Sequence, residues 1–188
     1  MMKIGIILGS TRPGRKVETV GRWVLDVASR RTDATFEVVD LCDFHLPVLD
    51  EETPPTWGNY QADHTKEWAA AIDRFDGFVF VTPEYNRSMT GALKNAIDYL
   101  YKEWNNKAAG FVSYGFSGGG VRAVEQLRQV MGELQIADVR TQVSLSLVTD
   151  FVDYQVCVPA EHHEANLVEM LDQLVAWSRA LRSVVAAA

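Results

Sequence analysis

The chain has 188 residues, of which 47% are hydrophobic, and it carries a formal net charge of −7. These totals favour a single globular domain that spans residues 1–188. They argue against a protein that holds nucleic acid through a broad basic face. No apolar stretch reaches membrane-spanning length, and the first residues read as a core strand rather than as a signal peptide. We therefore expect a cytoplasmic protein that binds neither nucleic acid nor a membrane.

Apolar runs bounded by Gly, Pro or Asp alternate with segments of helical periodicity along the whole chain. The runs predict strands at 3–8, 36–41, 77–82, 109–114 and 142–147. The periodic segments predict helices at 17–29, 65–75, 91–101, 122–134 and 161–185. This alternation is typical of an α/β fold with a doubly wound, five-stranded parallel sheet and helices on both faces. Residues 186–188 are expected to fray.

The segment 42–63 interrupts this rhythm with prolines, a glycine and clustered acids. It is either a surface loop without a role or a subunit contact, and we favour the contact, with anchors at Leu46, Leu49, Trp57 and Tyr60.

Two isolated cysteines without a CxxC pattern indicate neither a disulfide framework nor a zinc site. His45, His162 and His163 are expected to be solvated or capping residues rather than metal ligands. We therefore predict no metal site.

The loop 9–16 follows the first predicted strand with glycines, hydroxyls and cations. It lacks the Lys-Ser/Thr pair of a Walker A loop and the G-x-G-x-x-G of a dinucleotide site. The pattern favours a clasp for one phosphate group, made by Ser10, Thr11, Arg12 and the amino end of the next helix. The alternative is a plain turn with solvated cations.

Loops after the third and fourth predicted strands are also unusual. In 82–91, the backbone after Pro83, the Asn86 amide and Tyr85 suit a flat heteroaromatic ring, although Ser88 or Thr90 also suits a helix N-cap. In 113–120, three consecutive glycines indicate close approach to a ligand, which we favour, or a tight turn beside a subunit partner. These loops meet at one edge of a doubly wound sheet. Together they predict a flat ring on a phosphorylated tail, as in flavin mononucleotide (FMN).

Three motifs make the chain similar to a known family. They are Gly9-Ser10-Thr11-Arg12, then Pro83-Glu84-Tyr85-Asn86 leading into 91–98, and the serine and glycines from Ser113 to Ala123. Over nearly its whole length the chain resembles the flavodoxin-like, NAD(P)H-dependent FMN reductases, which include quinone, azo-dye and chromate reductases. Thr90 stands where many relatives carry proline, and Tyr99 where many carry tryptophan.

The resemblance implies FMN as cofactor and NADPH or NADH as co-substrate. It also implies a homodimer or homotetramer, in which Tyr99, Trp104 and the segment 42–63 would seal a neighbour's pocket. By the resemblance and the loop chemistry, the cofactor-binding residues are Ser10, Thr11, Arg12, Arg15, Pro83, Glu84, Tyr85, Asn86, Arg87, Ser113, Gly115, Gly118 and Gly119.

The expected reaction is a ping-pong transfer of hydride from the pyridine nucleotide to FMN, and of electrons from FMN to a small-molecule acceptor. The cofactor supplies the chemistry, so no catalytic side chain is predicted, and Glu84 is read as a structural carboxylate rather than a proton donor. Two alternatives remain: a flavodoxin-type electron carrier that does not oxidise NAD(P)H, and a non-redox nucleotide-binding protein. Cations at Arg12, Arg15, Lys16 and Arg87 favour an anionic visitor such as NADPH over a cationic redox partner.

Overall fold

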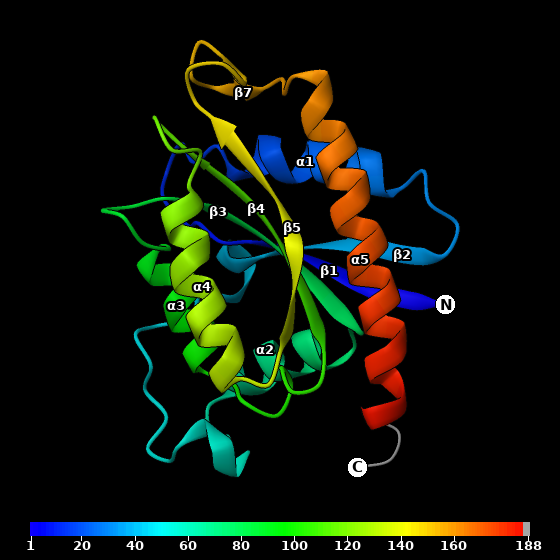
Figure 1. Ribbon diagram of the computed structural model, residues 1–188. Helices are drawn as coiled ribbons and strands as arrows, with labels where there is room; N and C mark the ends of the chain where they lie inside the picture. Colours follow the sequence, from blue (N-terminus) through cyan, green and yellow to red (C-terminus); the bar gives the residue numbers. More distant parts are fainter. Residues whose placement is uncertain (186–188) are drawn as a thin grey trace.

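The computed structural model describes residues 1–185, and its centre is a five-stranded parallel sheet (Figure 1). The strands lie in the order β2-β1-β3-β4-β5. The strands are β1 (Met2–Leu8), β2 (Ala34–Asp40), β3 (Gly77–Pro83), β4 (Ala108–Gly115) and β5 (Ala137–Ser146). This is the flavodoxin-like order, in which the sheet is wound in both directions from β1 and β3. The predicted fold class is confirmed. The expectation of fraying at 186–188 lies outside the described residues.

Helices cover both faces of the sheet. Alternate residues of each inner strand point to opposite faces, so that Ile6 and Val79 enter one core while Ile7 and Phe80 enter the other. The first core is closed by α1 (Val17–Ala28) and α5 (Glu161–Val185). The second is closed by α2 (Asp63–Asp73), α3 (Gly91–Asp98) and α4 (Val121–Glu133). In Figure 1, α3 and α4 lie to the left of the strands and α5 to the right. Of the helices in the described part, none is long and apolar enough to cross a bilayer.

The strand β5 begins at Ala137, five residues before the predicted start at 142. Its first half contains Asp138 and the exposed Arg140, because β5 is an edge strand with one neighbour. Alternating charges on such a strand do not form the apolar run that marks a buried one.

The segment 42–63 is held against the carboxyl end of α3. The 3₁₀ helix η1 (Leu41–Phe44) leads into it, and a second one, η2 (Pro55–Trp57), lies within it. The buried Tyr99 donates hydrogen bonds to Asp50 Oδ1 at 2.9 Å and to Pro47 O at 3.2 Å. Burial and the bond to Asp50 raise the pKa of Tyr99 to about 12. Tyr99 and Trp104 are both fully buried in their own chain, so the prediction that they seal a neighbour's pocket is wrong.

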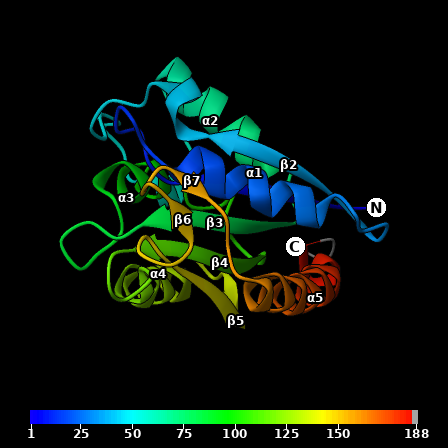
Figure 2. The same ribbon diagram turned by 90° about the horizontal axis from the view of Figure 1, so that it is seen from above.

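A small hairpin follows β5. Its strands, β6 (Phe151–Val152) and β7 (Val156–Cys157), have two residues each, which is too short for a sequence pattern to reveal. In Figure 1 this orange hairpin lies at the top, beyond the end of β5, and Figure 2 shows it between α1 and α4. His163, in the first turn of α5, is 9% exposed and has Nε2 3.3 Å from an oxygen of the buried Asp150, the residue before β6. The expectation of a solvated or capping role for His163 is therefore wrong.

Lys107 gives a testable pH dependence. Its buried ammonium donates to the carbonyl oxygens of Ile72 and Asp73, and burial lowers its pKa to about 8. Between about pH 8 and 10 the unfolded chain keeps a proton that the folded chain has lost. The free energy of unfolding should therefore rise with pH across this window, by on the order of 2 kcal/mol. Urea unfolding at several pH values measures the slope, and Lys107→Met should flatten it. An equal slope in both proteins would contradict this origin.

Candidate functional site

A cavity of about 340 Å³ lies at the carboxyl ends of β1, β3 and β4, where the three predicted loops meet. Its wall combines cations from the first loop with aromatic and glycine residues from the other two. The lining residues are Arg12, Gly14, Arg15, Lys16, Pro83, Glu84, Tyr85, Tyr114, Gly115, Phe116 and Leu147. The structure thus brings Arg12, Arg15, Pro83, Glu84, Tyr85 and Gly115 of the predicted set to one cavity.

The loop after β1 presents a free cation beside a helix start. The Arg12 side chain is exposed and forms no hydrogen bond or ion pair with the described residues. Lys16, the residue before α1, provides no side-chain cap. The first N–H groups of α1 therefore lack a side-chain acceptor and favour an anion. Ser10 is buried, and its hydroxyl shares a hydrogen bond of 3.1 Å with the Tyr85 hydroxyl. This bond joins the loop after β1 to the loop after β3.

Arg15 is already engaged by its own chain. Its guanidinium makes a bidentate pair with Asp40, at 2.7 and 2.5 Å, and donates to the carbonyl oxygen of Ser10 at 2.7 Å. The hydrogen bond with Asp40 raises the pKa of Arg15. Only 10% of the Arg15 side chain is exposed. Arg15 therefore links the end of β2 to the loop after β1, and its assignment to a phosphate group stays a prediction.

The loop after β3 is a tight hairpin. Asn86 and Arg87 both have positive φ, 50° and 68°, and Tyr85 and Ser88 exchange two backbone hydrogen bonds around them. This is the geometry of a type I′ turn. Asn86 and Arg87 form the exposed tip and do not line the cavity, although Tyr85 does.

Glu84 connects this loop to the start of α4. Its carboxylate, 7% exposed, accepts a bond of 2.6 Å from Arg122 Nε and one of 3.2 Å from Arg122 N. The second bond caps an N–H of the first helical turn. The reading of Glu84 as a structural carboxylate near a helix start agrees with this placement.

Thr90 connects the start of α3 to the loop after β1. Its hydroxyl accepts a bond from Leu93 N at 3.0 Å, which confirms the predicted N-cap of α3, and donates to Gly9 O at 2.5 Å. One side chain thus fixes both the helix start and the loop after β1. These two hydrogen bonds make the loop and the helix start rigid. Proline has no hydroxyl and would restrict the backbone through its ring instead.

Replacement of Thr90 by valine is expected to lower the free energy of unfolding by about 1–2 kcal/mol. The change keeps the shape of the side chain but leaves Leu93 N and Gly9 O without their partner. Thr90→Ser, which keeps the hydroxyl, is the matched control and should lose less than half as much in urea unfolding. Equal losses in the two variants would show that the methyl group and not the hydroxyl matters.

The glycines after β4 fold the loop back on itself. Gly119 and Gly120 have φ of +58° and +82°, and a Cβ on Gly120 would lie 2.8 Å from the Ser113 side chain. The Ser113 hydroxyl donates to Gly119 O at 2.7 Å. A tight turn within the chain therefore explains these two glycines and Ser113. A Cβ on Gly118 would meet nothing closer than 3.7 Å, which leaves that position open to a ligand.

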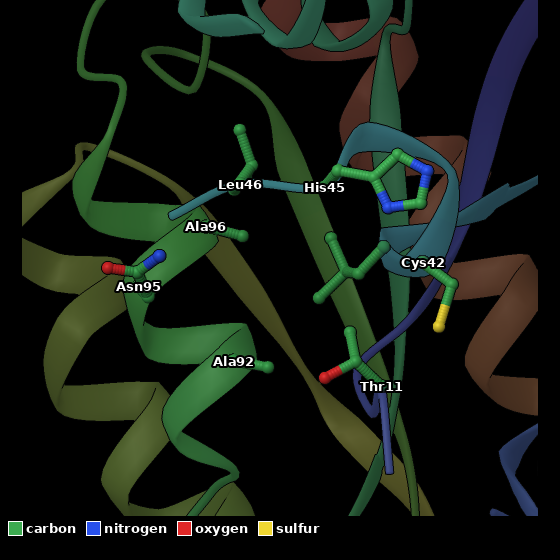
Figure 3. A pocket seen from close by; sticks show the side chains of 8 residues that line it. Thr11, Cys42, His45, Leu46, Ala92, Asn95 and Ala96 are labelled. Carbon is green, nitrogen blue, oxygen red and sulfur yellow. The ribbon is translucent and has the colours of Figure 1, made fainter. Parts of the chain in front are cut away.

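A second cavity, of about 450 Å³, lies behind the loop after β1 (Figure 3). Figure 3 shows Cys42 and His45 on one side and Ala92, Asn95 and Ala96 of α3 on the other. Of the predicted site residues it contains Thr11 alone. It lacks the cations that an anionic ligand would need, so we place the candidate site in the first cavity.

Sequence reasoning missed five residues of this neighbourhood, one of which is Leu147, which lines the cavity just after β5. Asp40, Arg122 and Phe116 act through contacts between distant segments, and Tyr114 lines the cavity from a strand that reads as core. Arg122 lies within the motif from Ser113 to Ala123. Its spacing after the glycines was the one feature of the sequence that could have indicated its place near the site.

Comparison with known proteins identifies the family. The model of the family described as NADPH-dependent FMN reductase matches residues 2–150. The chain is 42% identical to an NAD(P)H-dependent FMN reductase of Schizosaccharomyces pombe over 170 residues, which cover 89% of this chain and 84% of that protein. It is 32% identical to an NAD(P)H:quinone oxidoreductase of Solanum tuberosum, over 69% of this chain and 67% of that protein.

Among solved structures, the flavoenzyme FerB of Paracoccus denitrificans, an NAD(P)H:(acceptor) oxidoreductase, has the same fold. Its TM-score is 0.75 at 19% identity, over 95% of this chain and 98% of that one. The family match and the fold agree with the three loops gathered at one edge of the sheet. The chain belongs to the NADPH-dependent FMN reductase family.

Proposed function

We propose that this protein is an FMN-dependent oxidoreductase that takes hydride from NADPH or NADH and passes electrons to a small-molecule acceptor. The observation that carries the proposal is one cavity lined by Arg12, which has no partner among residues 1–185, and by residues of the loops after β3 and β4, beside the start of α1, which lacks a side-chain cap. Family membership supports it independently. Quinones are the acceptors we favour, since a related protein is named for them.

The residues present fit FMN. Arg12 and the first N–H groups of α1 would hold its phosphate. Thr11 lines the second cavity, so its assignment to the phosphate stays a prediction. Pro83 and Tyr85 from the loop after β3 and Gly115 from the end of β4 would contact the ring, because all three line the cavity. FMN supplies the hydride and electron chemistry when bound.

The chain's own task is to position these reactants. The Glu84–Arg122 pair fixes the loop after β3 relative to α4, and the Ser10–Tyr85 bond fixes it relative to the loop after β1. Such a site is assembled before the reactants arrive, which lowers the entropic part of the barrier. The hydride donor and the electron acceptor would bind one after the other at the same open side of the cavity, which is a ping-pong order.

Anaerobic mixing of FMN-loaded protein with NADPH tests the reaction. The yellow absorbance should disappear within seconds and return when a quinone is added. Persistence of the colour for many minutes would contradict the proposal and favour an electron carrier of flavodoxin type. Failure of purified protein to retain FMN at all would favour a non-redox nucleotide-binding protein.

We further propose one domain, 1–188, that forms a homodimer or homotetramer in the cytoplasm. The exposed Trp57 and Val48 on the segment 42–63 support a subunit contact there. The unpaired thiols of Cys42 and Cys157 are typical of a reducing compartment. Light scattering on the purified protein measures the mass, and a monomer at micromolar concentration would contradict the oligomer.

A further inference from the structure

Two aromatic rings stack in the open at the rim of the candidate site. Phe116, which lines the cavity, and Tyr154, at the tip of the β6–β7 hairpin, have ring centroids 6.2 Å apart and planes inclined by 13°. Phe116 is 63% and Tyr154 51% exposed. A single exposed aromatic side chain is common, but two of them in contact beside a cavity form a contiguous apolar patch, which is typical of a binding surface.

The backbone holds Tyr154 in a conformation that its side chain disfavours. Asp153 and Tyr154 have φ of 50° and 56°, and Gln155 N donates to Val152 O at 2.9 Å. These are the features of a type I′ turn, where glycine is preferred at the second of the two central positions. A tyrosine there is less stable than a glycine, because its Cβ atom crowds the backbone at positive φ. A structural role for the turn alone would be served better by glycine.

The hairpin that carries Tyr154 is tied down at both ends. The buried carboxylate of Asp150 accepts bonds from Ser146 N at 2.8 Å and from Ala160 N at 3.3 Å, and His163 lies against it. The hairpin is therefore a fixed projection with an exposed tip, and its base is not free to move away from the site.

The same region fixes Phe116. The Ser146 hydroxyl donates to Phe116 O at 3.0 Å, and Leu147 N donates to Gly115 O at 2.9 Å. Both rings are thus positioned by residues at the end of β5. The tip of the hairpin also lies beyond residues 2–150, the part that the family model matches. Phe116 lies within the matched residues, whereas Tyr154 lies beyond them.

We propose that Phe116 and Tyr154 form an aromatic plate that binds the flat, conjugated ring of the reactant that meets FMN. The inference rests on the proposed function and deepens it, because it assigns a specificity-determining surface to this chain. The ring is that of the electron acceptor or that of the pyridine nucleotide, which share this chemistry. Stacking contributes through apolar contact and ring electrostatics and needs no charge.

The test compares Tyr154→Gly with two controls. Glycine suits the positive φ, so the turn is retained while the ring is removed. Tyr154→Phe keeps the ring, and Val156→Ala shortens a half-exposed side chain on the same hairpin outside the pair. The first readout is calorimetric binding of anthraquinone sulfonate to oxidised, FMN-loaded protein without NADPH, where no turnover occurs. The second is steady-state KM for the same quinone, for ferricyanide and for NADPH.

Tyr154→Gly is expected to raise the Kd and KM of the quinone about three- to tenfold, while those of the controls and the KM of ferricyanide stay unchanged. A rise confined to NADPH would also support the plate and would assign it to the donor ring. Unchanged values for both reactants in Tyr154→Gly would overturn the proposal, even if the wild-type protein retains FMN and oxidises NADPH. A wild-type protein that does neither would instead contradict the proposed function.

Discussion

Replacement of Arg12 by alanine is expected to weaken the binding of FMN about 10- to 150-fold. Arg12 is exposed and has no partner among the described residues, so its loss should leave the fold unchanged. A charge-assisted contact with a phosphate group contributes roughly 1.5–3 kcal/mol. Calorimetric titration of the cofactor-free protein with FMN measures the change. The same titration with riboflavin, which lacks the phosphate, should give equal affinities for wild type and variant.

Arg22→Ala is the matched control for this experiment. Arg22 lies on α1, is exposed and carries the same charge, but it does not line the cavity. It should bind FMN as the wild-type protein does, because an exposed charge outside the site is largely screened by salt. An unchanged FMN affinity in Arg12→Ala would show that another group holds the phosphate. An equal loss for riboflavin would place Arg12 at the ring instead.

Much of the fold was predictable because its inner strands are buried on both faces. The runs around Ile6, Val79 and Val112 are continuous and apolar, and the helices between them have a clear period. The edge strand β5 and the two-residue strands β6 and β7 were not, because their pairing depends on neighbours distant in the sequence. The position of the candidate site was predictable because ligands of doubly wound sheets bind beyond the carboxyl ends of the strands.

The detail of the site was less predictable, for a physical reason. A sequence shows which residues carry charge, but it does not show which charges neutralise one another across 25 or 38 positions, as Arg15 with Asp40 and Glu84 with Arg122 do. Arg12 and Arg15 look equivalent in the loop, yet within the described part of the chain only the Arg15 side chain has a partner. The same limit applies to Tyr154, whose place beside Phe116 depends on a hairpin that the sequence did not reveal.

Replacement of Arg15 by alanine is expected to lower the free energy of unfolding of the cofactor-free protein by about 2–4 kcal/mol. The change leaves the carboxylate of Asp40, of which 18% is exposed, without its bidentate partner. It also removes the bond to Ser10 O, which is part of the loop after β1. Urea unfolding in the absence of FMN measures the loss.

Asp40→Asn distinguishes this structural role from direct binding of the phosphate. If Arg15 serves the ion pair, Asp40→Asn should destabilise the cofactor-free protein by a similar amount, and the double variant should lose less than the sum of the two single losses. If Arg15 instead holds the phosphate, Arg15→Ala should weaken FMN binding strongly and leave the stability of the cofactor-free protein near that of wild type. In that case Asp40→Asn should strengthen FMN binding, because it removes a negative charge near an anion and frees the guanidinium. The two roles therefore predict opposite signs for the effect of Asp40→Asn on FMN affinity, since a loosened loop weakens binding.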